Sequence, residues 1–221
     1  MSGLYPLKAG SVFAAIAIVA AIGRRAHHPF ARFGPANQVT AVRALLVASA
    51  AGLIGEAMTP ALATGALLVS GLATALDGVD GWLARRTGMA SAFGARFDME
   101  VDALLIQVLA ILVWQDGKAG AWVLASGLLR YAFVLAGRVW PWLRRPLSPS
   151  VRGKTICVGQ ILGLLIALVP SSTPPASSIV AGAALVALVY SFAVDIAWLW
   201  THREDRASSA PAEIERCEPA R

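Results

Sequence analysis

Long apolar stretches follow one another along this chain, and they constrain its fold more than any other feature of the sequence. A helix that crosses a bilayer needs roughly 20 mostly apolar residues, and 57% of the 221 residues are hydrophobic whereas only 14% are charged. Clusters of Pro, Gly, Ser or charged residues separate the stretches, as expected between helices. The six predicted spans are residues 38–54, 61–83, 95–114, 119–140, 155–169 and 177–200. We therefore expect an all-helical polytopic membrane protein.

The basic residues fall in alternate connections between these stretches. They cluster in residues 24–32, 85–96, 138–154 and 203–221. The intervening connections, which contain Lys118 as their one basic residue, are residues 56–60, 115–118 and 170–176. The positive-inside rule places the basic connections in the cytoplasm, and their even alternation supports six spans. Because the net charge of +6 is not gathered in one arm or face, the sequence does not favour nucleic-acid binding.

The two ends of the chain differ from this core. Residues 4–23 are apolar and are followed by Arg24 and Arg25, whereas a cleavable signal carries its charge before the apolar stretch, so we expect an additional helix that is retained. This helix is predicted either to span the membrane or to lie at its interface. The predicted divisions are an N-terminal helix with a basic juxtamembrane segment (1–36), a six-helix domain (37–201) and a polar cytoplasmic tail (202–221).

Four aspartates lie close together at the ends of two consecutive apolar stretches. Asp77 and Asp80 are three residues apart and Asp98 and Asp102 are four apart, so each pair shares a helix face. The short connection makes the two helices antiparallel neighbours, which brings together four carboxylates that cannot all ionise unless cations intervene. Ionisable residues in membrane spans indicate function. Oxygen ligands without His or Cys favour Mg²⁺ or Mn²⁺ over Zn²⁺.

Small residues are interspersed with these acids. Gly78, Gly81, Ala84 and Gly94 leave room for a ligand to approach the backbone. Arg85 follows Gly81 by one helical turn and offers a planar fork that suits a diphosphate. The pattern predicts a site for a metal-bound nucleotide diphosphate.

Two further acidic residues in the apolar stretches are assigned structural roles. Glu100 lies on a different helix face from Asp98 and Asp102, so we expect a cap or an interhelical contact rather than a metal ligand. Asp195 is expected to pair with Arg130 or with another basic residue inside the bundle.

Residues 77–102 read D-x2-D-G-x2-A-R-x8-G-x3-D-x3-D without a gap or a substitution, and this pattern resembles the signature of the CDP-alcohol phosphotransferase (CDP-alcohol phosphatidyltransferase) family. Residues 35–43 resemble the family's P-N-x-x-T-x-x-R segment, although Ala36 interrupts it, and residues 153–160 are more loosely similar to the opening of its fifth helix. The resemblance covers the chain from residue 37 to about 200 and implies the family's six-helix fold.

The resemblance also implies roles for individual residues. Asp77, Asp80 and Asp98 would ligate one or two Mg²⁺ or Mn²⁺ ions, two being expected, and Asp102 would both approach the metals and act as the general base. The expected nucleotide-binding residues are Asn37, Thr40, Gly81, Ala84, Arg85 and Gly94. A basic group near the site is explained either by topology alone or by binding of a phosphorylated acceptor. Its members are Arg138, Arg144, Arg145 and Lys154.

The implied activity is transfer of a phosphatidyl group from CDP-diacylglycerol to an alcohol, with release of CMP. The expected location is the cytoplasmic side of a bacterial-type inner or plasma membrane, in a homodimer surrounded by membrane lipids. Glycerol 3-phosphate is the preferred acceptor because of the basic group, while inositol phosphate, a small amino alcohol and phosphatidylglycerol (cardiolipin synthesis) remain open. A second reading is transfer from CDP-choline or CDP-ethanolamine to diacylglycerol. A different class, a transporter with intramembrane carboxylates, also fits the acids alone.

Overall fold

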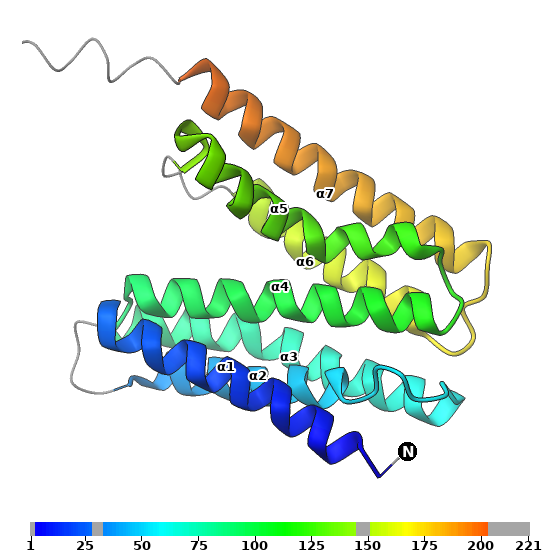
Figure 1. The fold of residues 1–221 in the computed structure, drawn as a ribbon. Helices are drawn as coiled ribbons and strands as arrows, with labels where there is room; N and C mark the ends of the chain where they lie inside the picture. Colours follow the sequence, from blue (N-terminus) through cyan, green and yellow to red (C-terminus); the bar gives the residue numbers. More distant parts are fainter. Residues whose placement is uncertain (1–2, 28–32, 145–150, 203–221) are drawn as a thin grey trace, which may run out of the picture.

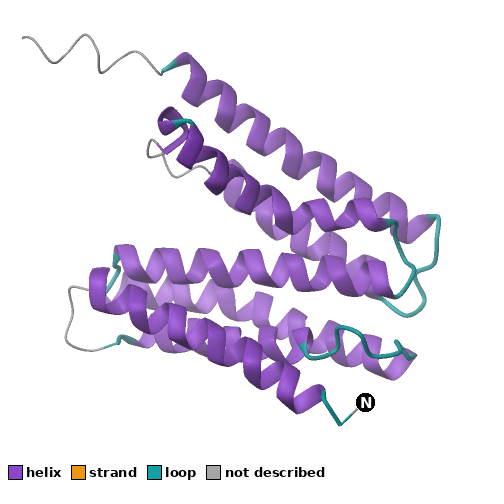
Figure 2. Ribbon diagram, viewed as in Figure 1, coloured by secondary structure: helices purple, strands orange, loops and turns teal. Residues whose placement is uncertain are grey.

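The structure, a computed structural model, describes residues 3–27, 33–144 and 151–202. Every regular element in these ranges is a helix (Figure 2). The elements are α1 (Tyr5–His27), α2 (Pro35–Ala51), α3 (Pro60–Thr87), α4 (Ala92–Gln115), the 3₁₀ turn η1 (Ala121–Leu124), α5 (Ala125–Val139), the 3₁₀ turn η2 (Pro141–Arg144), α6 (Val151–Leu168) and α7 (Ala176–Thr201). The all-helical fold predicted from the apolar stretches is confirmed.

The helices form two groups that meet along α4. In Figure 1, α1, α2 and α3 lie together on one side of α4, and α5, α6 and α7 lie on the other side. Helix α4 contacts members of both groups, including α2, α5 and α6. Its second half is accordingly buried, with Leu105, Leu109 and Leu112 all at 0% exposure. The burial of these leucines makes α4 the central element that fixes the two groups against each other.

Local signals define the hairpin formed by α3 and α4. Thr59 caps α3 by accepting a hydrogen bond from the Leu62 amide at 3.3 Å. Gly88 ends α3 in the left-handed conformation at φ 65°, which a residue with a side chain rarely adopts. Ser91 then caps α4 by accepting a hydrogen bond from the Gly94 amide at 3.0 Å. The end of α3 and the start of α4 are therefore held close together.

The predicted helices are present, but the count of six membrane spans is not confirmed. Four of the described helical segments are long and apolar enough to cross a membrane, and they are Tyr5–Arg24, Pro60–Thr87, Ala121–Val139 and Ala176–Thr201. Helix α2 has 17 residues, which is short for a span. The first half of α4 contains Arg96, Asp98, Glu100 and Asp102, and the first turn of α6 contains Arg152 and Lys154. Length and charge thus separate these three helices from the other four segments.

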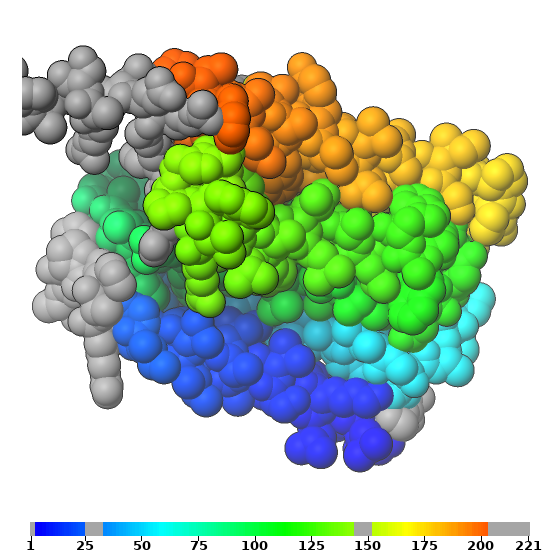
Figure 3. All heavy atoms as spheres, turned by 45° about the horizontal axis from the view of Figure 1, so that its top comes forward, coloured from blue at the N-terminus to red at the C-terminus, as the bar shows by residue number. Residues whose placement is uncertain are grey.

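The N-terminal apolar stretch forms helix α1, as predicted, and packs on the bundle. The Tyr5 hydroxyl donates to the Ser49 carbonyl at 3.1 Å, and the Lys8 ammonium pairs with Glu56 at 3.1 Å. In the space-filling view α1 lies on the same face of the molecule as α5 (Figure 3). The tail at residues 203–221 lies outside the described residues.

The ends of the helices that flank the basic connections lie at one end of the bundle. Figure 1 shows the ends of α1, α3, α5 and α7 there, together with the starts of α2, α4 and α6. The N-terminus of α1 and the connections from α2 to α3, from α4 to α5 and from α6 to α7 lie at the opposite end. This separation agrees with the alternation of basic connections in the sequence.

Candidate active site

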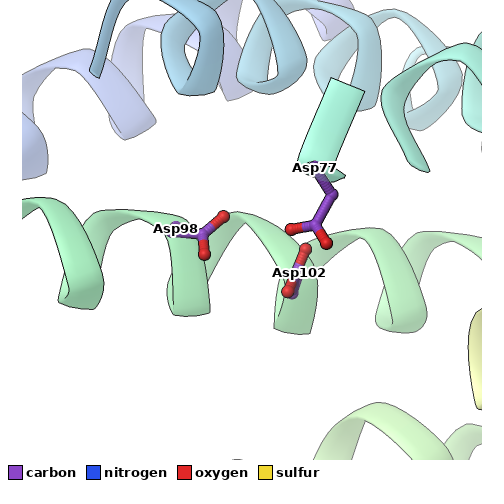
Figure 4. Close-up of side chains that lie close together, drawn as sticks. All are labelled: Asp77, Asp98 and Asp102. Carbon is purple, nitrogen blue, oxygen red and sulfur yellow. The ribbon is translucent and has the colours of Figure 1, made fainter. Parts of the chain in front are cut away.

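The α3–α4 hairpin brings three of the predicted aspartates together. Asp77 on α3 and Asp98 and Asp102 on α4 each offer a carboxylate oxygen, and these oxygens lie within 4.8 Å of one another. Figure 4 shows the Asp77 carboxylate above the Asp102 carboxylate, with Asp98 one turn earlier on α4. The spacing of three and four residues places the carboxylates toward a shared space, as the sequence predicts.

The guanidinium of Arg43, from α2, lies among all four aspartates. Arg43 is 0% exposed. Its Nη1 donates to Asp80 Oδ2 at 2.7 Å and to Asp98, and its Nη2 donates to Asp102 and lies 3.1 Å from Asp77 Oδ1. Its Nε donates to the Ala73 carbonyl at 3.0 Å, which ties the fork to α3. One buried cation therefore compensates part of the charge of four carboxylates.

Asp80 differs from the other three aspartates in its surroundings. Its side chain is 5% exposed, whereas those of Asp77, Asp98 and Asp102 are 16%, 37% and 21% exposed. Asp80 Oδ2 accepts hydrogen bonds from the Thr40 hydroxyl at 3.0 Å and from Arg43. Thr40 and Asp80, predicted for nucleotide and metal binding, are thus brought together with Arg43 at the back of the site.

A cavity of about 520 Å³ opens in front of the three more exposed aspartates. Asp77, Asp98 and Asp102 form one wall, while Arg130 on α5 and Lys154 on α6 belong to its lining from the other group of helices. Carboxylates and cations in one cavity suit a ligand that carries both metal-bound and free phosphate groups.

Further ion pairs border this cavity. Arg130 Nη2 lies 2.6 Å from Glu100 Oε1, so Glu100 makes the interhelical contact that its helix face predicts. Asp195 on α7 pairs with Arg152 on α6 rather than with Arg130. The expectation of a basic partner for Asp195 is confirmed, and its partner comes from the neighbouring helix.

The other residues predicted to bind the nucleotide come from α2, α3 and α4. A Cβ atom on Gly94 would stand 2.8 Å from Asn37 Oδ1, so a larger residue there would displace the Asn37 side chain from α4. Arg85 Nη1 lies 3.4 Å from where a Cβ on Gly81 would stand, and Ala84 is half-buried on the same helix. The described lining of the 520 Å³ cavity includes none of the five residues Asn37, Gly81, Ala84, Arg85 and Gly94.

Of the described basic residues predicted to hold the acceptor, some line the cavity and others do not. Lys154 lines the cavity, whereas Arg138 is exposed on α5 and is not part of the described lining. Arg144 ends η2, and Arg145 lies outside the described residues. Sequence reasoning did not assign Arg130 to the acceptor, although an arginine within an apolar stretch is itself a sign of function.

Arg43 was also not among the predicted site residues. Arg43 ends the upstream P-N-x-x-T-x-x-R segment and lies within an apolar stretch. Like the aspartates, it is therefore an ionisable residue whose position indicates a functional role. Its contacts could not be derived from the spacing, because they depend on how α2 packs against α3 and α4.

The donor set fits a hard divalent cation. Asp77, Asp98 and Asp102 would provide oxygen ligands, which Mg²⁺ and Mn²⁺ prefer. The carboxylates are partly exposed to the cavity, so an ion bound to them would remain accessible to a diphosphate.

Replacement of Arg43 should destabilise the metal-free protein and increase its response to metal. Arg43→Gln leaves the buried Asp80 and three partly exposed carboxylates without their cation. Losing one partner of a buried ion pair costs about 3–5 kcal/mol. We expect a lower melting temperature in chelator, and a larger rise on adding Mg²⁺ than in the unmodified protein. Thermal unfolding in detergent measures both.

Arg86→Gln is the control for this experiment, because Arg86 is exposed and contacts the Trp82 ring rather than the aspartates. Arg43→Lys should fall between the two, since one ammonium cannot reach all the partners of the guanidinium. A melting temperature of Arg43→Gln in chelator equal to that of Arg86→Gln would contradict the compensating role of Arg43.

Comparison with known families agrees with this geometry. The model of the family described as CDP-alcohol phosphatidyltransferase matches residues 33–195. The match includes all four aspartates, Arg43, Arg130 and Lys154, and it begins after α1. No solved structure matches the chain.

Proposed function

The chain belongs to the CDP-alcohol phosphatidyltransferase family, and on that premise we propose that it transfers the phosphatidyl group of CDP-diacylglycerol to an alcohol and releases CMP. The family supports phosphatidyl transfer from a CDP-alcohol to an acceptor. The observation that carries the assignment to this site is the cavity in which three carboxylates face two cationic side chains. The transporter reading loses its support, because the acids lie within the residues matched by a transferase family.

The proposed reaction is a displacement at the phosphorus atom that carries diacylglycerol. The acceptor oxygen forms a bond to this phosphorus, the bond from phosphorus to the bridging oxygen breaks, and CMP leaves with that oxygen. Asp102 accepts the hydroxyl proton of the acceptor, since its carboxylate lines the cavity. Asp77, Asp98 and Asp102, with Asp80 as a further predicted ligand, would hold divalent cations, of which two are expected. Such cations would neutralise charge on the diphosphate.

The remaining side chains position the substrates in this proposal. Arg85 offers two parallel donors to the diphosphate, and Asn37, Thr40, Gly81, Ala84 and Gly94 are the other proposed nucleotide contacts. Arg43 holds the aspartates in place from behind, through its contacts with α3 and α4.

The proposed acceptor carries a phosphate group, with glycerol 3-phosphate preferred. Arg130 and Lys154 line the cavity and would bind such a phosphate, which is the specific observation favouring this class over a neutral alcohol. Inositol phosphate shares this chemistry. Phosphatidylglycerol as acceptor, and the alternative donors CDP-choline or CDP-ethanolamine with diacylglycerol, are outcomes of the same experiment.

The experiment offers labelled CDP-diacylglycerol and a panel of alcohols to the purified protein with Mg²⁺ or Mn²⁺, and identifies the lipid products by mass spectrometry. We expect acceptor-dependent release of CMP, with glycerol 3-phosphate giving the most product. Product from CDP-choline and diacylglycerol alone would replace the donor assignment. Absence of CMP release with every pair would refute the proposed function.

The active site is proposed to face the cytoplasm. Single cysteines at Arg86 or Arg206 should then be protected from an impermeant thiol reagent in intact cells, whereas cysteines at Gly117 or Ser172 should react. Cys157 and Cys217 are first replaced by Ser, so that each variant has one thiol. Permeabilised cells provide the control, because every exposed site should then react. Labelling at Arg86 with protection at Ser172 would reverse the orientation.

A further inference from the structure

A second hollow lies on the face of α4 that is turned away from the reaction cavity. It has a volume of about 560 Å³ and runs between α1 and α4, with Tyr131 of α5 at its border. Phe97 and Val101 contribute to its α4 side, while Asp98 and Asp102 line the reaction cavity. At 3.6 residues per turn these two sets point about 100° apart around α4, so the groove and the cavity lie on different sides of this helix.

The length of this groove corresponds to one leaflet of a bilayer. Its lining on α1 extends from Val12 to Gly23. At 1.5 Å per residue this is roughly 16 Å, close to half of a hydrocarbon core of about 30 Å. The groove is therefore long enough for one acyl chain that begins at the headgroup and ends near the bilayer midplane.

The two charged side chains of the groove come from α4, Arg96 about one turn after the start of the helix and Glu100 about one turn further in. Arg96 and Glu100 come from the first half of α4, whereas the deeper lining, such as Val12 and Leu104, is apolar. Arg96 is exposed and has no ion-pair partner in the described part of the chain. This one-sided distribution matches a lipid, with a charged head and an apolar tail.

The groove also borders the reaction cavity. Glu100 lines the groove, Arg130 lines the cavity, and the two side chains are joined by the 2.6 Å ion pair. A lipid whose diphosphate lies at the aspartates can thus pass a tail beside this ion pair into the groove.

We infer that the groove between α1 and α4 binds an acyl chain of the lipid-anchored nucleotide donor. The inference rests on the proposed function and assigns to α1, which lies before the family match, a part in binding the substrate. Because the bilayer is as apolar as the groove, the contact positions the donor rather than drawing it from the lipid. Its effect should therefore appear as a preference for long tails.

Blocking the groove should remove this preference. Ala15 lines the groove eight residues before Gly23, about 12 Å from its polar end. Ala15→Trp should block a palmitoyl tail, whereas a butanoyl tail is too short to reach this depth. Ala14→Trp is the matched control, because Ala14 is an exposed alanine on α1 outside the groove lining.

The measurement is the ratio of kcat/KM for dipalmitoyl and dibutanoyl CDP-diacylglycerol in the same detergent micelles. We expect Ala15→Trp to lower this ratio roughly tenfold, less than the ~100-fold that misplacement of a reacting group causes. Ala14→Trp should leave the ratio unchanged. Should Ala15→Trp be inactive with both donors, the smaller Ala15→Phe is measured by the same criterion.

A ratio unchanged in the active Ala15 variant would overturn the assignment of the groove, whatever the absolute rates. An equal fall of the ratio in Ala14→Trp would also overturn it, because the effect would not depend on the groove. The unmodified protein tests the proposed function separately. If it releases CMP from neither donor, the function fails, whereas release from both donors with no effect of Ala15→Trp rejects the groove alone.

Discussion

Asp77→Asn and Asp98→Asn should each abolish CMP release and remove high-affinity binding of Mg²⁺ or Mn²⁺, while the helical fold is retained. Each replacement deletes a charged oxygen ligand from a group whose oxygens lie within 4.8 Å of one another. The remaining carboxylates would bind a divalent ion with less charge and fewer ligands. Titration of Mn²⁺ followed by paramagnetic resonance measures the affinity, and helical circular dichroism in detergent checks the fold.

Glu100→Gln is the matched control for these variants. Glu100 is an acidic residue on the same helix as Asp98, but it lines the other face of α4 and pairs with Arg130. We expect its Mn²⁺ affinity to remain close to that of the unmodified protein. Full activity of Asp77→Asn or Asp98→Asn, or of the unmodified protein in chelator, would contradict the metal site.

Asp80→Asn separates two roles that one aspartate can have. The sequence pattern predicts a metal ligand, whereas the side-chain contacts connect Asp80 to Thr40 and Arg43. Loss of Mn²⁺ affinity equal to that of Asp77→Asn would make Asp80 a ligand. If Asp80→Asn retains its Mn²⁺ affinity but has a lower melting temperature in chelator, the role of Asp80 is to hold Arg43 in place.

The helices could be predicted from the sequence, but the number of spans could not. Apolar stretches bounded by Pro, Gly and Ser indicate where helices lie. The caps Thr59, Gly88 and Ser91 extend α3 and α4 by a few residues beyond the predicted stretches 61–83 and 95–114. Whether a helix crosses a bilayer depends also on its length and on the charges that its neighbours bury. The 17 residues of α2 and the charged first half of α4 set these two helices apart from the four segments that are long and apolar enough to cross a membrane.

The candidate site shows a similar division. The spacing of Asp77, Asp98 and Asp102 predicts their convergence, because it depends on one hairpin and on the period of a helix. The positions of Arg43 and Arg130 depend on packing between helices that are distant in the sequence. Spacing within a helix carries no information about that packing, so the sequence identified the acids and Lys154 but missed Arg43 and Arg130.

Asp102→Asn should lower the rate of phosphatidyl transfer by ~10²- to 10⁴-fold, the usual contribution of a general base, without preventing donor binding. Asn has nearly the same shape and keeps an oxygen that can accept from Arg43 Nη2, so the arrangement of α2 and α4 should survive. Because Asp102 also belongs to the carboxylate group, the rate is measured at saturating Mg²⁺. Single-turnover CMP release at saturating donor then reports the proton transfer step.

Arg85→Lys provides the opposite pattern, and the comparison distinguishes a base from a binding residue. A lysine ammonium cannot reproduce the two parallel donors of a guanidinium, so this variant should weaken donor affinity and change the saturated rate much less. Titration of CDP-diacylglycerol into both variants measures the affinity. If Asp102→Asn turns over at the unmodified rate, another group must accept the proton. Glu100 is a poor substitute, because it lines the groove on the far face of α4 and is held there by Arg130.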